Sequence, residues 1–243
     1  MKLDDIRKLH QKKYRQASDY YLVEGEHLVL ELLKAAAGQP YLMRSELYVT
    51  AAYEHWKSPL KTHLVGERQM ARLADTTTPQ GILAVVPMPE ASISRPGANG
   101  EKAVYLHEIQ DPGNLGTILR TLAWFGGFRC LLSPGSVDPF NPKVVRASMG
   151  AIFHVPLETD LPLQDLTGRY HSFACLDLNG DRLSSPAFGQ HDCYLFGNEA
   201  RGLPREQLAP LNASAYTING RGEIESLNLA SAVNICAYEL NRG

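Results

Sequence analysis

Between residue 103 and the C-terminus, short apolar segments alternate with segments of helical periodicity. The segments expected as strands are 103–109, 130–133, 173–178, 193–196 and 215–218, and those expected as helices are 115–125, 142–149 and 227–240. Strands that are separated by helices form a mostly parallel sheet with helices on both faces. This pattern predicts an α/β fold in which ligands bind at the loops after the carboxyl ends of the strands.

The preceding region is expected to form a small α/β domain of its own. Helical patterns and strand-like segments alternate there, at 3–16, 25–37, 46–50, 62–65 and 81–86. A stretch rich in Pro, Gly and Ser follows, which is typical of a linker. We therefore predict a first domain over 1–88, a linker over 89–102 and a second domain over 103–243.

Composition limits the functional classes that the chain can belong to. Its 243 residues are 44% hydrophobic with a net charge of −2, which suits a globular protein that needs no metal or disulfide staple. The cysteines are far apart and form no CxxC pair, so no zinc site is expected. The chain shows no signal peptide and no run of about 18 apolar residues. A cytoplasmic protein without a membrane span is expected.

The first sixteen residues form a basic segment on a slightly acidic chain. Such a segment is either a solvated helix face or a surface that binds RNA phosphates. In the second case RNA binding would weaken with salt. The candidate RNA contacts are Lys8, Lys12, Lys13 and Arg15.

A polar loop follows the expected strand 103–109 and leads into a helix. Its sequence DPGNLGTILR, at 111–120, places a turn at Pro112 and Gly113 and an N-cap at Asn114. Arg120 then lies in the first turns of the helix, from where it can reach back toward the loop. The alternative interpretation is an ordinary capped helix with a surface arginine.

The apolar segment 193–196 runs directly into a second loop, GNEARGLP at 197–204. Two glycines with an amide, a carboxylate and a guanidinium at a strand end form a concave backbone site with exposed N–H groups. The alternative is a tight turn with a surface pair between Glu199 and Arg201.

A third polar loop lies between the expected strand 215–218 and the last helix. Ser226 can cap that helix, whereas Asn228 is unusual inside it because its side chain competes for backbone hydrogen bonds. The alternative is a capped and tightly packed terminal helix. No loop carries the G-x-G-x-x-G fingerprint or the Walker P-loop, which disfavours a nicotinamide dehydrogenase.

Together, and in this order, the three loops resemble the motifs of the SpoU/TrmH family of RNA 2′-O-ribose methyltransferases. The resemblance rests on NLGTILR at 114–120, FGNEARGL at 196–203 and SLNLASA at 226–232, and it covers about residues 104–243. The first region is similar to the L30e-like substrate-binding domain of many members, on KKYR at 12–15, EG at 24–25 and TTPQG at 77–81.

The resemblance implies a fold, a cofactor and partners. The second domain is expected to have the SPOUT fold, with a trefoil knot that binds S-adenosylmethionine; periodicity alone cannot predict a knot. Members are typically homodimers with the active site near the subunit interface. The implied substrate is structured RNA, and the appended first domain favours ribosomal RNA over transfer RNA by analogy. No metal is expected.

The family's residue roles carry over to the matching positions of this chain. The implied cofactor positions, which act mainly through backbone groups, are Gly197, Ile218 and Leu227. The implied catalytic and RNA-handling positions are Asn114, Arg120, Glu199, Ser226 and Asn228. The third motif departs from the family at Leu229 and Ala230, where members often have Val and Ser, and Ala230 receives no role.

Arg120 is expected to stabilise the reacting oxygen rather than to act as a base. A guanidinium has a pKa above about 12, so we expect it to donate to the 2′-oxygen or to an adjacent phosphate. The proton acceptor is then the phosphate, water or Glu199. Two further interpretations remain, the same reaction on transfer RNA and a non-catalytic RNA-binding or ribosome-assembly protein with this fold.

Overall fold

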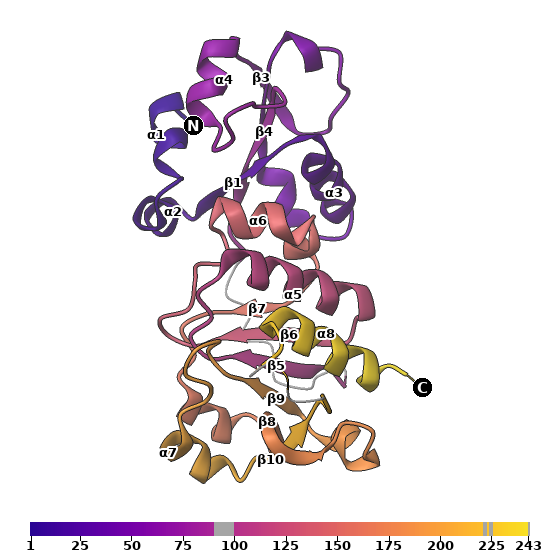
Figure 1. The fold of residues 1–243 in the computed structure, drawn as a ribbon. Coiled ribbons are helices and arrows are strands. Elements are labelled where there is room, and N and C mark those ends of the chain that lie inside the picture. The colour runs from indigo at the N-terminus through magenta and orange to yellow at the C-terminus, as the bar shows by residue number, and fades with distance from the viewer. Residues whose placement is uncertain (90–99, 221–222, 224–225, 243) are drawn as a thin grey trace. The chain divides into compact units, whose positions relative to one another are not determined.

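The computed structural model describes residues 1–89, 100–220, 223 and 226–242. Internal contacts divide the chain into two units (Figure 1). The first unit contains the described residues up to 89 together with Asp138–His154, and the second contains the other described residues. Within the part of the chain that the structure describes, no helix is both long and apolar enough to cross a membrane.

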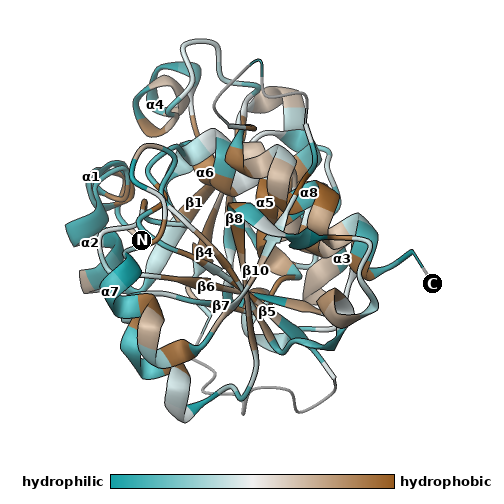
Figure 2. Ribbon diagram, turned by 60° about the horizontal axis from the view of Figure 1, so that its bottom comes forward, coloured by the Kyte–Doolittle hydropathy of each residue, from teal (hydrophilic) through white to brown (hydrophobic). Residues whose placement is uncertain are grey.

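A four-stranded sheet forms the centre of the first unit, in the order β1-β4-β2-β3. Its strands are β1 (Tyr20–Glu24), β2 (Glu46–Val49), β3 (Lys61–Leu64) and β4 (Ile82–Pro87). Its helices are α1 (Leu3–Lys8), α2 (Lys12–Ser18), α3 (Glu26–Ala36) and α4 (Glu67–Leu73). Figure 2 shows hydrophobic residues on β1 and β4 and hydrophilic residues on α2, as expected when a sheet forms the core.

The single helix predicted over 3–16 is two helices, which is a correction. Gln11 has an extended backbone, with φ −102° and ψ 132°, and it separates α1 from α2. The break keeps Leu9 in the core while its carbonyl oxygen accepts a hydrogen bond from the Arg15 guanidinium at 2.7 Å. The strand β1, for which the sequence analysis makes no prediction, follows α2 directly.

The segment Asp138–His154 packs within the first unit, although it lies in the range predicted for the second domain. Asp138 forms an ion pair with the buried Arg15, and the ring of Phe140 lies 4.8 Å from that of Tyr21. The helix α6 (Pro142–Ser148) follows in this segment. The predicted linker falls mostly outside the described residues, so the predicted domain boundaries stay a prediction.

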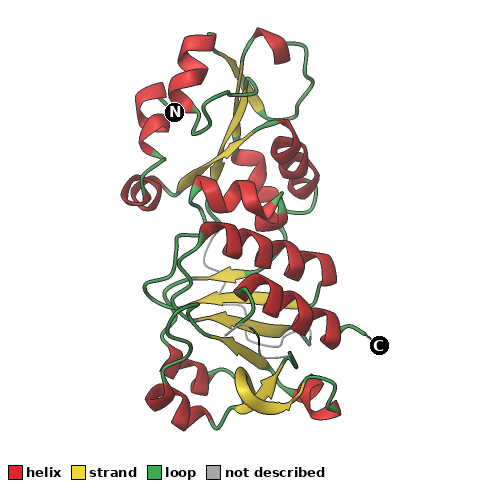
Figure 3. Cartoon of the chain, viewed as in Figure 1, coloured by secondary structure: helices red, strands yellow, loops and turns green. Residues whose placement is uncertain are grey.

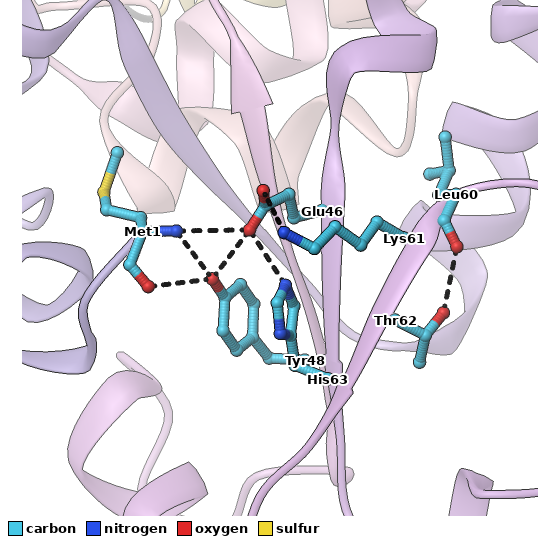
Figure 4. A network of polar contacts seen from close by, with 7 residues as sticks. All are labelled: Met1, Glu46, Tyr48, Leu60, Lys61, Thr62 and His63. Carbon is cyan, nitrogen blue, oxygen red and sulfur yellow. Dashed lines mark hydrogen bonds and ion pairs between the residues drawn. The ribbon is translucent and has the colours of Figure 1, made fainter.

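Glu46, at the start of β2, is the centre of a polar network (Figure 4). One carboxylate oxygen lies 3.2 Å from the Met1 ammonium, 3.0 Å from the Tyr48 hydroxyl and 2.9 Å from Nε2 of His63. Burial raises the pKa of Glu46, but hydrogen bonds from the terminal ammonium, Tyr48 and His63 together outweigh it and lower the pKa to about 2.

Acidification is therefore expected to destabilise the first unit in a defined pH window. Because the folded pKa of Glu46 is depressed, the ionised group contributes stability above its ordinary pKa of 4.5, and this contribution is lost as the pH falls toward about 2. Urea unfolding of the wild type and of Glu46→Gln, at neutral pH and at about pH 3, measures the effect. Equal pH dependence in the two proteins would contradict the assignment.

The second unit contains a six-stranded sheet in the order β10-β8-β9-β5-β6-β7. Its strands are β5 (Lys102–Leu106), β6 (Phe128–Leu132), β7 (Leu157–Glu158), β8 (Phe173–Arg182), β9 (Cys193–Phe196) and β10 (Ser214–Thr217). Every strand pair in it is parallel. The helices are α5 (Pro112–Phe125), α7 (Arg205–Leu208) and α8 (Leu229–Leu240). The predicted α/β fold class is confirmed.

Both faces of this sheet are covered. Tyr105 packs with Leu166 and Leu211 on one face, whereas the neighbouring Val104 lines a narrow interior space with Val233 of α8 on the other. This alternation follows from the period of two residues in a strand. The helices α5 and α8 lie side by side in Figure 1 and Figure 3. The trefoil knot stays a prediction.

The strand order reverses beside β5. From β5 the chain proceeds to β6 and β7 on one side, and it then returns to build β8, β9 and β10 on the other. Open parallel sheets bind ligands at the carboxyl ends of the strands where such a reversal occurs. A ligand site is therefore expected at the loops that follow β5 and β9.

Candidate active site

Asn114 lies in the first turn of α5, just after the loop that follows β5, and its side chain does not cap the helix. Asp111, and not Asn114, is the N-cap of α5, because its carboxylate accepts a hydrogen bond from the Asn114 backbone N–H at 2.7 Å. Pro112 occupies the first helical turn, where its missing N–H costs nothing. The predicted cap at Asn114 is thus wrong by three residues. Because Asp111 caps the helix, the side-chain amide of Asn114 is available for other contacts.

The loop before α8 presents a second asparagine in the same way. Asn228 is the N-cap of α8, and its Oδ1 accepts a hydrogen bond from the Ser231 backbone N–H at 3.2 Å. Ser226, the predicted cap, lies two residues earlier and is exposed. It makes no hydrogen bond with any described residue.

A hydrogen-bond relay joins three loops that are far apart in the sequence. Nδ2 of Asn228 donates to Oδ1 of Asn114 at 2.9 Å, and Nδ2 of Asn114 donates to Oε1 of Glu199 at 3.0 Å. The helix cap determines the direction of this relay, because Oδ1 of Asn228 already accepts a backbone N–H. The amide of Asn228 must then donate onward, and Glu199 receives a hydrogen at the end of the relay.

The end of the relay is open to a ligand. Glu199 is exposed, and its Oε2 has no hydrogen-bond partner among the residues that the structure describes. Its Oε1 accepts a hydrogen bond from the Asn114 amide, so Oε2 is the oxygen that remains for a ligand. The site can therefore hold a polar group between an oriented amide and a carboxylate oxygen.

In the loop after β9 the backbone at Gly202 and Leu203 folds back and crosses close to Gly197, which requires a glycine at position 197. A Cβ added at Gly197 would lie 2.3 Å from the carbonyl carbon of Gly202 and 2.6 Å from the backbone nitrogen of Leu203. Asn198 and Gly202 exchange backbone hydrogen bonds of 3.1 and 2.8 Å across the crossing. No residue with a side chain fits at position 197 without moving this backbone.

Asn198 braces two loops, and the sequence analysis gives it no separate role. Its side chain is buried, its Oδ1 accepts from the N–H groups of Ala200 and Arg201, and its Nδ2 donates to the carbonyl of Glu108 at 2.8 Å. The signal for this role was an amide directly between a glycine and a carboxylate, since such a side chain can satisfy loop backbone groups. The brace holds the base of the Glu199 loop.

The residue that Asn198 contacts has a strained backbone. Glu108 has a φ of 48°, in the left-handed region, which costs a non-glycine residue roughly 1–2 kcal/mol. Its N–H donates to Oγ of Ser133 at 2.7 Å. Beside it, burial lowers the pKa of His107, an effect that Glu108 opposes and Arg201 reinforces. His107 is therefore neutral near pH 7, consistent with a structural histidine.

Arg120 is exposed on α5 and stands apart from the relay. It follows Asn114 by six residues, which places the two side chains about 120° apart around the helix and about 9 Å apart along it. Arg120 makes no hydrogen bond or ion pair with any residue in the described ranges. Hydrogen bonds thus connect Asn114, Glu199 and Asn228. Within the described part of one chain, neither Arg120 nor Ser226 forms a hydrogen bond with these three residues.

The positions predicted for the cofactor lie on the same loops. Gly197 is at the backbone crossing, Ile218 follows β10 and is half-buried, and Leu227 precedes α8 and is 45% exposed. Ile218 and Leu227 share partly uncovered apolar surface, whereas Gly197 packs against the backbone of Gly202 and Leu203. Their cofactor role stays a prediction.

The basic residues of the first unit differ in accessibility. Lys12 and Lys13 are exposed, and Lys8 forms a 2.9 Å ion pair with Asp5. Arg15 is only 2% exposed and its guanidinium bonds to Asp138 and to the Leu9 carbonyl. This burial leaves Arg15 no surface for a phosphate, so the role predicted for it is corrected to a structural one.

Comparisons with known proteins cover both units. The model of the SpoU rRNA Methylase family matches residues 101–238, and that of the MRM3-like substrate binding domain matches residues 1–84. The 23S rRNA (guanosine(2553)-2′-O)-methyltransferase RlmP of Bacillus subtilis is 32% identical over an alignment of 244 positions, which covers 98% of this chain and 95% of that protein.

Two solved structures have the same fold over nearly the whole chain. A protein of the TrmH family from Porphyromonas gingivalis is 32% identical with a TM-score of 0.80, and the match covers 99% of this chain and 96% of that one. An AdoMet-bound rRNA methyltransferase from Sinorhizobium meliloti is 27% identical with a TM-score of 0.84, over 99% and 94%. The predicted resemblance is confirmed, and the chain belongs to the SpoU rRNA methylase family.

Proposed function

We propose that this protein transfers a methyl group from S-adenosylmethionine to a ribose 2′-hydroxyl of ribosomal RNA. The observation that carries the proposal is the relay from Asn228 through Asn114 to Glu199, at the carboxyl ends of β5 and β9. The relay offers an oriented amide and a free carboxylate oxygen, which suit a hydroxyl that must lose its proton. A non-catalytic RNA-binding protein would need no such arrangement.

Large-subunit ribosomal RNA is the proposed substrate. The Bacillus subtilis relative is named for a guanosine of 23S rRNA, and its similarity spans almost the full length of both chains. Residues 1–84 match the MRM3-like substrate binding domain, and the mitochondrial rRNA methyltransferase 3 of Homo sapiens is a further relative of this chain. Both observations favour ribosomal RNA over transfer RNA. Exposed Lys12 and Lys13 remain the proposed phosphate contacts of this domain.

Gly197, Ile218 and Leu227 are the proposed cofactor positions. Ile218 and Leu227 have apolar surface that no described residue covers completely, which suits the apolar parts of a ligand. Gly197 lets the loop backbone at Gly202 and Leu203 pack directly against it, which gives the loop its shape. When bound there, S-adenosylmethionine supplies an electrophilic methyl group. Residues that hold the ribose in line with it contribute most of the rate enhancement.

Glu199 is the proposed acceptor of the hydroxyl proton. Its free Oε2 supports this role over the phosphate and water alternatives, since a positioned carboxylate is a better acceptor than water. Asn114 orients the carboxylate, and Arg120 donates to the oxygen as negative charge develops on it. Incubation with methyl-labelled S-adenosylmethionine and a transcript of large-subunit rRNA tests the function; absence of ribose 2′-O-methylation would contradict it.

The active protein is proposed to be a homodimer that buries one face of α5 and α8. Trp124 is 85% exposed, and Ile235 and Tyr238 are exposed on α8. The Tyr238 ring lies 6.5 Å from that of Phe125, so apolar side chains of both helices meet. Arg120 precedes Trp124 by four residues and lies on the same face of α5. A second copy on this face would meet Arg120.

Trp124→Asp is expected to convert the dimer to a monomer, because a buried charge in an apolar interface is costly. Sedimentation equilibrium of the wild type and the variant measures this. Leu178→Asp is the matched control, since Leu178 is 76% exposed on β8, outside the proposed interface. A dimer of unchanged affinity in Trp124→Asp, or a monomeric wild type, would contradict the proposed interface. The predicted cytoplasmic localisation stays a prediction.

A further inference from the structure

A pair of charged side chains, distinct from the relay, joins the same two loops. The Arg201 guanidinium forms an ion pair with Oε2 of Glu108, and the two side chains are 70% and 35% exposed. Ion pairs with this much exposure contribute little to stability, because water screens them and two long side chains lose freedom. Stability alone therefore does not account for the pair.

Both members of the pair are held at their backbones by one buried amide. Oδ1 of Asn198 accepts the Arg201 N–H at 3.2 Å, and Nδ2 of Asn198 donates to the Glu108 carbonyl at 2.8 Å. The second anchor of Glu108 is the buried Ser133, whose Oγ accepts its N–H. The two side chains thus project from fixed points, with Arg201 two residues from Glu199.

Glu108 occupies a position that glycine would occupy without strain. Its φ of 48° is unfavourable for any residue with a Cβ, and a weak exposed ion pair does not offset that cost. Strained residues that persist beside a site are commonly part of its function. The side chain of Glu108 therefore calls for a role other than stabilising the folded loop.

We propose that Arg201 binds a phosphate of the RNA next to the target ribose, and that Glu108 holds this guanidinium in place until the phosphate displaces it. The proposal rests on the proposed function of the same site. Arginine binds phosphate through two parallel, charge-assisted hydrogen bonds, whereas the exposed carboxylate offers a weaker alternative. Glu108 is thus a positioning residue and an internal competitor of the RNA backbone.

Competition gives the two residues opposite effects on RNA binding. Arg201→Gln is expected to raise the dissociation constant for a large-subunit rRNA transcript about tenfold and to lower the salt slope of log K by about one. Glu108→Gln frees the guanidinium and is expected to lower the dissociation constant about threefold. The double variant should behave as Arg201→Gln. Filter binding at several salt concentrations measures all three.

Controls separate this inference from the proposed function. Arg205→Gln removes a charge from an exposed site four residues away and should leave the salt slope near that of the wild type. Glu108→Gly, which also relieves the strain, should tighten RNA binding like Glu108→Gln. Weaker RNA binding in both Glu108 variants, or a salt slope in Arg201→Gln equal to that of Arg205→Gln, would overturn the inference. Because filter binding needs no turnover, missing methylation of the transcript would overturn the proposed function alone.

Discussion

Arg120→Ala is expected to lower kcat by about 10²–10³-fold while leaving the affinity for S-adenosylmethionine within about twofold of the wild type. The residue is exposed and has no partner among the described residues, so its loss leaves the fold intact. A guanidinium cannot act as a base near neutral pH, but its N–H groups stabilise negative charge on the 2′-oxygen as the proton leaves. Isothermal titration with the cofactor and methyl incorporation into rRNA measure the two effects.

Mixed dimers test where Arg120 acts. If Arg120 of one subunit serves the relay of the other, mixing Arg120→Ala with Glu199→Gln creates mixed dimers with one intact site. Random pairing at equal concentrations then restores about one quarter of the wild-type activity, because half of the dimers are mixed and half of their sites are intact. No recovery on mixing would place Arg120 and Glu199 in the same chain's site. Wild-type turnover in Arg120→Ala itself would remove the residue from the chemistry.

Asn228→Asp is expected to lower kcat about 10²-fold at almost unchanged stability. Aspartate caps a helix as well as asparagine does, so α8 keeps its N-terminus. The new carboxylate cannot donate to Asn114, whose amide then turns its hydrogens toward residue 228 and its oxygen toward Glu199. Glu199 faces an acceptor in that arrangement and needs a proton of its own, which prevents it from accepting one from the ribose.

A second substitution at the same position separates the relay from the cap. Asn228→Ala loses both, so it should lose turnover and about 1 kcal/mol of unfolding free energy. Urea unfolding and single-turnover methylation of both variants measure the difference. Full turnover in Asn228→Asp would show that the direction of the relay is unimportant and that Asn228 acts only as a cap. Equal destabilisation of both variants would contradict the premise that aspartate preserves the cap.

Local patterns were sufficient for five of the six strands of the second unit's parallel sheet, whereas the two-residue strand β7 was not predicted. The segment predicted at 193–196 coincides with β9, because a run of apolar residues between polar neighbours suits a strand that is buried on both faces. The helices predicted at 115–125 and 227–240 begin within three residues of α5 and α8. The loops that carry Asn114 and Glu199 follow the strands that the pattern predicted, so their convergence was predictable too.

Features that depend on distant contacts were beyond local patterns. Arg15 was interpreted as a surface cation, since its partner Asp138 lies 123 positions away in the sequence. The packing of Asp138–His154 with the first unit has the same cause. At Asn114 the difficulty was local, because Asp111 is an equally good cap three residues earlier. Nothing in the sequence predicts the left-handed backbone of Glu108, because glycine is the residue that usually indicates this conformation.

The central claim is that loops around positions 114, 199 and 228 converge to hold a ribose against a proton acceptor. Mass-spectrometric mapping of ribose methylation in large-subunit rRNA tests it most directly, in cells that lack the protein and in cells that regain it as wild type or as Asn114→Leu. We expect one 2′-O-methyl group to disappear with the protein, to return with the wild type and to stay absent with Asn114→Leu. An unchanged methylation map in cells without the protein, or full methylation by Asn114→Leu, would contradict the account.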